Sequence, residues 1–422
     1  MMLTRRSVTV GAAAVTTAAL ALGPEAMAAP RRRRAKTSLE GGQAVLDWQR
    51  ISFRTVYADL TPVLGSTPPA TPAATPIPIG LPVLGFVSLA MHMAAQRSAH
   101  LGSSSESAAV AQAAHDVLAH YFPGSAVRLA GDLALTLDPI GGHTKVKGSR
   151  IGADAARDML ASREGDGWFD GSIHYSKAPG AGVWQSATAS GDMLAPWLGS
   201  LRPLVVEAET PSGPYPLAST AWAADYEEAR AFGGAVSTER SPSQTATALF
   251  YNSSNAAVAM GDAVRRYLGA HPLGILETAH IFAAMHAASA DTFIRCWQMK
   301  RDVGFWRPFQ AISGQYDDGN AGTTAEPGWA PLVTMPNYSD YFSGHGSATA
   351  PQVEVVRRVL GENTGLEMLS TASTRPPYTT LSEIEYDAFH ARIWGGLHYR
   401  KAMTDAYELG HSTAARVLTA LG

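Results

Sequence analysis

Helical patterns dominate this 422-residue chain wherever a regular pattern is visible, and segments that alternate apolar with polar residues are scarce. The segment from Leu276 to Lys300 contains neither glycine nor proline, which favours one long helix. Because regular strands are not indicated, helices must bury their apolar faces against one another. The sequence therefore predicts an all-α fold, a helical bundle with long irregular loops.

Start and stop signals predict the bounds of further helices. A capping box places serine or threonine three residues before glutamate or glutamine, and proline is favoured at the first helical position. We expect one helix that opens with Ser103 and Glu106 and ends before Pro123, one from about Ser241 to Leu268, one that follows Ser343 and runs to Leu360, and one that opens with Ser382 and Glu385 and runs through Trp394. The proline-dense stretch from Thr61 to Pro82 resists helix and strand alike, so we expect an extended connector there.

The first 28 residues have the features of an export signal. Arg5 and Arg6 precede a mild apolar run and a small-residue cleavage site, Ala26-Met27-Ala28, which is typical of a twin-arginine signal. We therefore expect a signal peptide at 1–28, a basic flexible tail at 29–40, and a single mainly α-helical domain at 41–422 whose site-bearing half is about 270–422. The protein should be secreted or extracytoplasmic without stable membrane insertion, because the apolar run is too short for a bilayer.

Composition narrows the classes of partner. Charged residues make up 16% of the chain and the formal net charge is −3, so no basic excess suggests nucleic acid, and any site for an anion must be local. Cys296 is the only cysteine, which excludes an intramolecular disulfide and favours a buried structural thiol in a helical stretch. A homodimer is compatible with a helical-bundle surface, but no stripe of residues identifies one.

Three basic segments flanked by glycine lie in the last third of the chain. They are Lys300-Arg301-Asp302-Val303-Gly304-Phe305-Trp306-Arg307-Pro308, Ser343-Gly344-His345 and Arg392-Ile393-Trp394-Gly395-Gly396-Leu397-His398. Each has an ordinary explanation by itself, as solvated surface charge or as a capping or core histidine. Together they supply two arginines, a lysine, a serine and two histidines, a set that suits a tetrahedral or trigonal oxyanion.

The first segment can bring its two cations together. Phe293, Trp297 and Lys300 share one helical face, which would place the lysine beside an aromatic wall. Gly304 then permits a turn, and the proline after Arg307 holds that arginine outside helical geometry. Without such a turn, seven residues of helix would separate the two charges by about 10 Å along the axis.

The other two segments can present their polar groups to the same point. Ser343-Gly344-His345 precedes a predicted helix, whose first backbone N–H groups attract anions, and His345 could be an acid or base. Gly395-Gly396 should end the helix of Arg392, so that the arginine and His398 can converge. A neutral imidazole at His398 could ligate a metal-like centre or attack phosphorus.

These residues resemble the vanadium-dependent haloperoxidases and the related type 2 phosphatidic-acid phosphatase superfamily. The family pattern is Lys, six residues, Arg-Pro, then Pro-Ser-Gly-His, then Ser-Arg, three residues, Gly, one residue, His. The matching positions are Lys300, Arg307 and Pro308, then Ser343, Gly344 and His345, then Arg392, Gly396 and His398. The resemblance to bacterial haloperoxidase-like proteins extends over nearly all of the mature chain.

Three positions depart from the family pattern. Phe342 stands where the second motif has proline, and Ala391 stands where the third has serine. Both changes should alter the shape of a loop more than its charge. Ala402 occupies a position where some relatives have an aspartate that could orient the axial histidine, so the partner of His398 is left to be identified.

The resemblance implies a role for each matching residue. The groups that would bind the equatorial oxygens of vanadate are Lys300, Arg307, Arg392, Ser343 and the N–H of Gly344. His398 would be the axial ligand of vanadium, and His345 would be the acid or base that helps hydrogen peroxide bind and react. Trp297 and Tyr338 would line the pocket, Tyr338 at a position that the family links to halide handling.

By this resemblance the protein would be a vanadate-dependent haloperoxidase, which uses hydrogen peroxide to oxidise bromide or chloride and halogenates a small organic substrate. The alternative is a secreted acid phosphatase of the same superfamily, with His398 as nucleophile and His345 as leaving-group acid. The same residues serve both reactions because vanadate mimics phosphate at the transition state. A phosphate-binding protein without turnover is a third hypothesis, against which the presence of two histidines argues.

Overall fold

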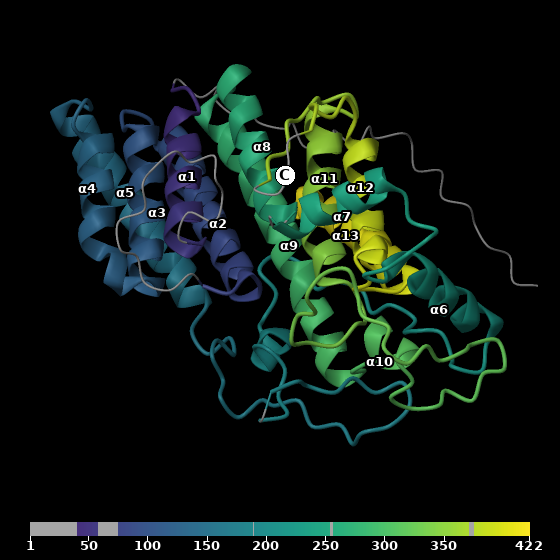
Figure 1. Cartoon of the computed structure of the whole chain (residues 1–422). Coiled ribbons are helices and arrows are strands. Elements are labelled where there is room, and N and C mark those ends of the chain that lie inside the picture. The colour runs from purple at the N-terminus through teal and green to yellow at the C-terminus, as the bar shows by residue number, and fades with distance from the viewer. Residues whose placement is uncertain (1–39, 58–74, 189, 254–255, 371–374) are drawn as a thin grey trace, which may run out of the picture. The chain divides into compact units, whose positions relative to one another are not determined.

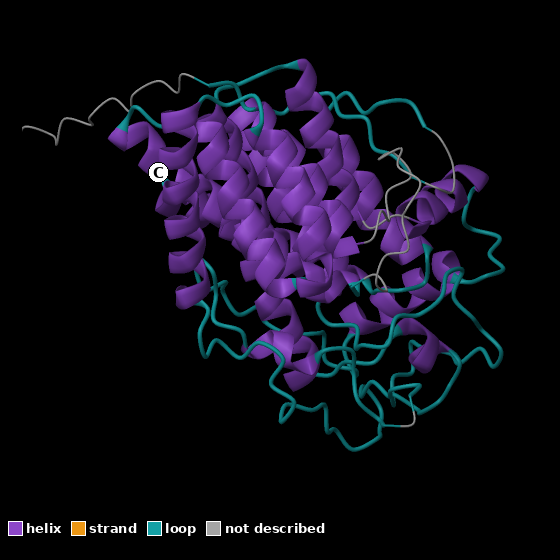
Figure 2. Cartoon of the chain, turned by 90° about the vertical axis from the view of Figure 1, so that its left-hand side faces the viewer, coloured by secondary structure: helices purple, strands orange, loops and turns teal. Residues whose placement is uncertain are grey.

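A computed structural model describes residues 40–57, 75–188, 190–253, 256–370 and 375–422. Within these ranges the chain forms helices and loops, with strand-like pairing limited to isolated bridges, so the predicted all-α fold is confirmed (Figure 2). The α-helices are α1 (Gln43–Tyr57), α2 (Ile77–Leu101), α3 (Glu106–Tyr121), α4 (Ala126–Leu137), α5 (Gly142–Ser162), α6 (Thr220–Gly233), α7 (Pro242–Ser253), α8 (Ala256–Ala270), α9 (Ile275–Asp302), α10 (Pro308–Ile312), α11 (Gly344–Leu360), α12 (Leu381–Trp394) and α13 (Arg400–Leu421). The predicted signal peptide and all but residue 40 of the predicted tail lie outside the described residues.

Helix α9 lies at the centre of the bundle, between α2 on one side and α11 and α13 on the other (Figure 1). It is the long helix predicted from the glycine-free and proline-free segment, and its middle is rich in small buried residues such as Ala284 and Ala288. Small side chains let neighbouring helices approach closely. The site-bearing end of α9 is therefore held by packing on several sides.

Helix α2 corrects one prediction. The extended connector expected from Thr61 to Pro82 is wrong for its last six residues, which belong to α2, while residues 58–74 lie outside the description. Pro78 is tolerated in the first turn, where an N–H has no helical partner, and Pro82 is accepted because the helix is buried. By length and composition α2 alone among the described helices could cross a membrane, but 83% of its most apolar window is buried, as in a core helix.

Two predicted helix caps are shifted in the structure. Helix α3 is capped by Ser105, whose side chain accepts a hydrogen bond from the N–H of Ala108, and not by Ser103. Helix α12 opens with a capping box of Thr380 and Glu383 in place of Ser382 and Glu385. In both cases the expected serine spacing is present, but a neighbouring residue has the extended backbone that a cap requires.

The helix predicted from about Ser241 to Leu268 is described as two helices. Its start is confirmed, because the N–H of Ser241 donates to Gln244 Oε1 at 2.8 Å and the N–H of Gln244 donates to Ser241 Oγ at 3.2 Å. Helix α7 then ends at Ser253, and α8 begins at Ala256.

The loop between α5 and α6 is long, as predicted, and it is tied to α9. The N–H groups of Leu204, Val205 and Val206 donate to the buried carboxylate of Asp291 at 2.5 to 3.0 Å. Farther along α9, Trp297 Nε1 donates to the carbonyl of Leu194 at 3.0 Å. This loop therefore covers the C-terminal half of α9, next to the predicted site.

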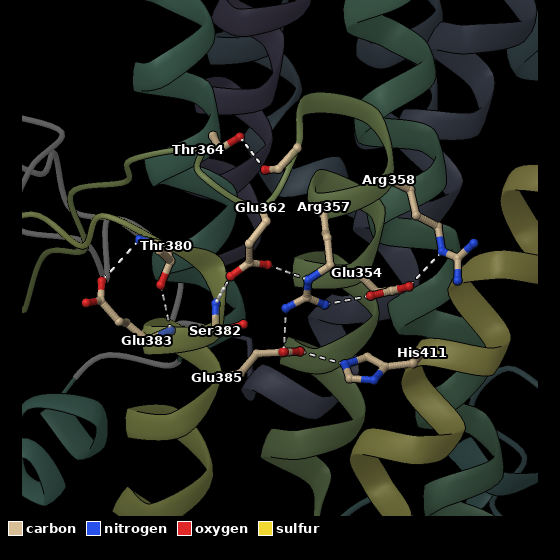
Figure 3. Close-up of polar contacts among 11 residues, drawn as sticks. Glu354, Arg357, Arg358, Glu362, Thr364, Thr380, Ser382, Glu383, Glu385 and His411 are labelled. Carbon is tan, nitrogen blue, oxygen red and sulfur yellow. Dashed lines mark hydrogen bonds and ion pairs between the residues drawn. The ribbon is translucent and has the colours of Figure 1, made fainter.

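An ion-pair network joins α11, α12 and the middle of α13 (Figure 3). Arg357 on α11 contacts the carboxylates of Glu354, Glu362 and Glu385 at 2.6, 2.7 and 2.6 Å. Glu385 on α12 also lies 2.6 Å from His411 on α13. The network connects α11, α12 and α13, the three helices whose ends carry the second and third motifs.

Candidate active site

The end of α9 places Lys300 beside aromatic rings, as its spacing predicts. The rings of Phe293 and Trp297 stack at 4.1 Å, and Lys300 Nζ lies 5.8 Å from the Trp297 ring and 5.2 Å from the ring of Tyr338. Lys300 is fully buried. Trp297 is buried beneath Tyr338, so Tyr338 forms the half-buried outer part of this wall.

The chain turns after α9 and brings Arg307 back to the same wall. Gly304 has a φ of +60°, a backbone conformation that other residues rarely adopt. Arg307 then caps the short helix α10, and its guanidinium lies 5.0 Å from the Tyr338 ring. Its Nη1 donates to the carbonyl of Leu397 at 2.7 Å, which links the first motif to the third.

The tripeptide Tyr338-Ser339-Asp340 organises the cationic groups through its backbone. Lys300 Nζ donates to the carbonyls of Ser339 and Asp340 at 2.8 Å each, and Arg307 Nε donates to the carbonyl of Tyr338 at 2.8 Å. The side chain of Asp340 lies with Oδ1 2.7 Å from Nδ1 of His398. The segment 338–340 therefore orients Lys300 and Arg307 of the first motif through its carbonyls, and His398 of the third motif through the Asp340 side chain.

The second motif forms the start of α11. Ser343 is the N-cap, and its Oγ accepts from the N–H of Gly346 at 3.2 Å. Gly344 packs closely on Trp297, because a Cβ at this position would lie 3.1 Å from the Trp297 ring. His345 is partly exposed and has no hydrogen-bond partner within the described ranges, so its imidazole is free to act on a bound group.

The third motif closes the site between α12 and α13. Arg392 lies in the last turn of α12, and Gly396, with a φ of +74°, turns the chain so that His398 precedes α13. A Cβ on Gly396 would lie 2.4 Å from the carbonyl of Gly233, so only glycine fits. Arg392 and His398 are 3% and 1% exposed, and the double glycine ends the helix as predicted.

The arginines have unused donors. Nη2 of Arg307 is buried without a partner, and so is Nε of Arg392, whose guanidinium makes no hydrogen bond to any other described residue. Buried polar groups are nearly always paired, and an unpaired buried charge is costly. These donors are therefore suited to a ligand with several anionic acceptors.

The pKa values of the site residues are shifted because several cationic groups are buried close to one another. Burial lowers the pKa of Lys300 to about 7 and that of Arg392 to about 9, and Arg307 adds to both effects. Burial, followed by the neighbouring cations, also holds the pKa values of His345 and His398 well below their usual range. Burial raises the pKa of Asp340 to about 7 against the influence of Arg307 and Lys300. An anion bound among these groups would favour the charged forms of the lysine, the arginines and the histidines.

Vanadate fits this set of residues. It is an oxyanion, and the site offers two guanidinium groups, an ammonium group and the N-terminus of α11 to its oxygens. His398 has Nδ1 engaged by Asp340, and its Nε2 has no hydrogen-bond partner in the described part of the chain. Those same residues contain no group of three or more His, Cys, Asp or Glu that could hold a metal cation.

The structure brings every predicted site residue into one cluster and adds Asp340, which the motifs do not contain. Ala402, at the position where relatives carry an acid, contributes only its carbonyl, which accepts from the N–H of Ser343 at 3.0 Å. The signal that could have identified Asp340 is its place five residues before His345, in a loop otherwise made of aromatic and hydroxyl residues. Cys296 is buried and donates to the carbonyl of Phe342 at 3.1 Å, which confirms a structural thiol.

Comparisons with known proteins agree with this geometry. Residues 280–421 match a family model described as the VCPO second helical-bundle domain. No curated protein sequence matches the chain. Among solved structures, the first bacterial vanadium-dependent iodoperoxidase is similar with a TM-score of 0.71 and 15% identity, over 90% of this chain and 97% of that one.

Two structures of a bacterial vanadium-dependent chloroperoxidase are also similar. The holo form has a TM-score of 0.61 at 15% identity, over 82% of this chain and 92% of that one. The apo form has a TM-score of 0.60 at 14% identity, over 82% and 93%. The chain therefore has a fold like that of the bacterial vanadium-dependent haloperoxidases, and its residues 280–421 match the VCPO second helical-bundle domain.

Proposed function

We propose that this protein is a vanadate-dependent haloperoxidase, which uses hydrogen peroxide to oxidise bromide or chloride and halogenates a small organic substrate. The observation that carries the proposal is the guanidinium of Arg392, which is buried beside Arg307 and Lys300 without a hydrogen-bond partner among the described residues. A buried cluster of three cations needs a counter-anion. The oxygens of vanadate would accept hydrogen bonds from the donors that remain free.

Each residue then has a defined task. Bound vanadate supplies a Lewis-acidic centre at which hydrogen peroxide is activated toward halide. Lys300, Arg307 and Arg392 compensate the charge of the oxyanion, and Ser343 and the N–H of Gly344 donate to it at the start of α11. His398 would hold the group through Nε2, since Nδ1 is engaged by Asp340.

Asp340 acts on His398 as a positioning residue. Its contact with Nδ1 fixes the ring orientation and the tautomer that leaves Nε2 available as a ligand. The aspartate expected after His398 in some relatives is thus replaced by an aspartate from the loop before α11. This assignment explains how the site tolerates Ala402.

His345 is the proposed acid or base. Its depressed pKa, caused by burial and then by Arg392, keeps the free imidazole neutral near pH 7. A neutral imidazole can accept a proton from hydrogen peroxide and return it to a leaving oxygen. Its partial exposure lets it exchange that proton with water.

A phosphatase is the alternative, because an imidazole oriented by Asp340 would serve equally well as a nucleophile toward phosphorus. Two observations favour the haloperoxidase. The similar solved structures are described as an iodoperoxidase and a chloroperoxidase. Trp297, three residues before Lys300, is also a residue by which the sequence resembles the haloperoxidase branch.

The test is bromination of phenol red by the purified protein with hydrogen peroxide and bromide in phosphate-free buffer, with and without orthovanadate. Turnover that depends on vanadate supports the proposal. Lys300→Met should abolish it, while Arg301→Met, at a half-buried neighbour paired with Asp302, should retain it. Absence of bromination, together with hydrolysis of a phosphate ester that vanadate inhibits, would assign the site to a phosphatase.

We also propose that the protein is exported through the twin-arginine route. The support is the sequence Thr4-Arg5-Arg6-Ser7-Val8 with the cleavage site that follows it. Intact-mass analysis of the extracytoplasmic protein should give a chain that begins near residue 29. A full-length chain retained in the cytoplasm, unchanged when both arginines become lysine, would contradict this proposal.

A further inference from the structure

The loop at 338–343 contacts the first and third motifs and leads into the second. Its carbonyls accept hydrogen bonds from Lys300 and Arg307. The side chain of Asp340 lies against Nδ1 of His398, in the turn before α13. The geometry of the site therefore depends on where this loop lies relative to α13. A side chain that fixes the loop to α13 would act on the site without touching a bound group.

Tyr341 connects the loop to α13. Its side chain is fully buried, and its hydroxyl donates to Oδ2 of Asp405, in the second turn of α13. Tyr341 follows Asp340 directly in the loop, and α13 begins two residues after His398. Two neighbouring side chains of the loop therefore bind the same end of α13 and the turn before it, Asp340 through His398 and Tyr341 through Asp405.

Asp405 is itself held in place. Nζ of Lys401, one turn earlier on α13, lies 2.6 Å from Oδ1 of Asp405, which leaves Oδ2 for the tyrosine. Asp405 is only 5% exposed. Hydrogen bonds to an ionised carboxylate are stronger than those between neutral groups. The carboxylate of Asp405 is therefore a fixed acceptor for the hydroxyl of Tyr341.

The same contacts hold a segment of the long loop between α5 and α6. The N–H of Gly213 donates to the hydroxyl of Tyr341 at 3.0 Å, and Nζ of Lys401 donates to Ser212 Oγ at 3.1 Å. The hydroxyl thus donates one hydrogen bond and accepts another. Burial, followed by the contact with Asp405, raises the pKa of Tyr341, which keeps the hydroxyl protonated as the donor in that contact.

We propose that Asp405 is a positioning residue of the oxyanion site, which acts through Tyr341 on the loop that orients His398. The inference rests on the proposed function, because His398 would hold the oxyanion of that proposal. Among the described residues, the hydrogen bonds of the Asp405 side chain go to Tyr341 and Lys401. Without the contact to Tyr341, Asp340 could move away from Nδ1 of His398, and the imidazole would lose its fixed orientation.

Titration calorimetry of the full chain with orthovanadate gives the first test. Tyr341→Phe removes the hydroxyl and keeps the ring, so it should weaken vanadate binding by about 10-fold, the lower end of the range for outer partners of a ligating histidine. Asp405→Ala should have a similar effect, and the double variant should bind no more weakly than Asp405→Ala alone, because both changes break one contact. Asp405→Asn keeps an acceptor for the tyrosine and should recover most of the affinity.

Tyr251→Phe is the matched control. The hydroxyl of Tyr251 is also buried, and it lies 2.7 Å from the hydroxyl of Tyr378, outside the three motifs and the loop at 338–343. Each phenylalanine variant loses one buried hydroxyl, and thermal unfolding measures the cost of that loss. Only Tyr341→Phe should also weaken vanadate binding. Equal vanadate affinity in the wild type, Tyr341→Phe and Asp405→Ala would show that the contact is merely structural and would overturn the proposal.

A measurement without vanadate separates this inference from the proposed function. In protein labelled with ¹⁵N at histidine, the tautomer of His398 with the proton on Nδ1 should dominate in the wild type, and both tautomers should appear in Tyr341→Phe. The spectrum of His398→Gln identifies the signals. If the wild type binds no vanadate but the tautomers change, the proposed function fails and the positioning role stands. If the wild type binds vanadate and Tyr341→Phe alters neither tautomer nor affinity, the positioning role fails and the proposed function stands.

Discussion

Oδ1 of Asp340 lies 2.7 Å from Nδ1 of His398, and both side chains are only 1% exposed. The pair joins the loop before α11 to the turn before α13, and it is the sole hydrogen bond to the His398 ring among the described residues. A buried carboxylate in this position holds the ring in one orientation. The ring would otherwise rotate about its side-chain bonds and lose its alignment with the cation cluster.

Replacing Asp340 should weaken vanadate binding and slow turnover by about 10- to 100-fold, the usual cost of losing an outer partner of a ligating histidine. Asp340→Asn keeps an acceptor for Nδ1 and should be less affected than Asp340→Ala. Vanadate affinity, measured by titration calorimetry, and the bromination rate would test this order. Asp317→Asn removes an exposed carboxylate and should leave both quantities unchanged.

Oxyanions should stabilise the fold. Buried donors of Arg307 and Arg392 lack hydrogen-bond partners in the free protein, and a bound anion would supply them. At a ligand concentration of about 100 times the dissociation constant, the gain in unfolding free energy should be about 2.7 kcal/mol. Urea unfolding in buffers with and without orthovanadate measures it. No change in the midpoint at saturating vanadate or phosphate would contradict an oxyanion site.

Arg392→Met separates binding from stability. Loss of a charged donor should weaken vanadate binding by about 2 to 3 kcal/mol, or roughly 30- to 150-fold. Without oxyanion the variant should be as stable as the wild type or more so, since Arg392 is a buried cation beside Arg307. A large loss of stability in oxyanion-free buffer would show that Arg392 is a structural residue instead.

Local sequence signals predicted the parts of the site that depend on neighbouring residues. The shared face of Trp297 and Lys300, the turn at Gly304 and the helix that begins after Ser343 follow from helical spacing and glycine geometry, and the structure has each of them. Helix caps were less predictable. Ser103 and Ser105 are both serines near the start of α3, and tertiary contacts decide which of them has the extended backbone of a cap.

The pairing of Asp340 with His398 could not be assigned from sequence, because the two residues are 58 positions apart. Their contact depends on how the loop before α11 meets the turn before α13, which no local pattern encodes. The helical start of α2 was missed for a related reason: burial among other helices overrides the unfavourable effect of Pro82. Predictions therefore failed where long-range packing outweighs local preference.

Acid should destabilise the protein through buried histidines at the contact of α2 and α9. Burial, with a smaller effect of His280, lowers the pKa of His92 to about 4, and burial lowers that of His286 to about 3. Unfolding restores ordinary pKa values, so the unfolded state binds more protons below pH 6.5. Stability is therefore present above pH 6.5 and is lost as pH falls toward 4, by about 2 kcal/mol per histidine between pH 7 and pH 5.

Urea unfolding at pH 7 and pH 5 tests this dependence. His92→Leu removes the titrating group and should reduce the difference in unfolding free energy between the two pH values by about 2 kcal/mol. His143→Gln, at an exposed position on α5, is the control and should leave the difference unchanged. An equal pH dependence in wild type and His92→Leu would show that other groups are responsible.

Arg357 should contribute more to stability than the adjacent Arg358. Arg357 contacts three carboxylates from two helices and a loop, and its side chain is 23% exposed (Figure 3). Arg357→Met leaves Glu362 without a counter-charge, next to Glu354 and Glu385, which keep only Arg358 and His411 as partners. The loss should cost about 2 kcal/mol after allowance for partial exposure. Arg358, 51% exposed and paired with Glu354 alone, should lose less than about 0.5 kcal/mol in Arg358→Met. Chemical denaturation of the two variants compares them, and an equal loss would mean that the network of Arg357 adds nothing beyond a surface ion pair.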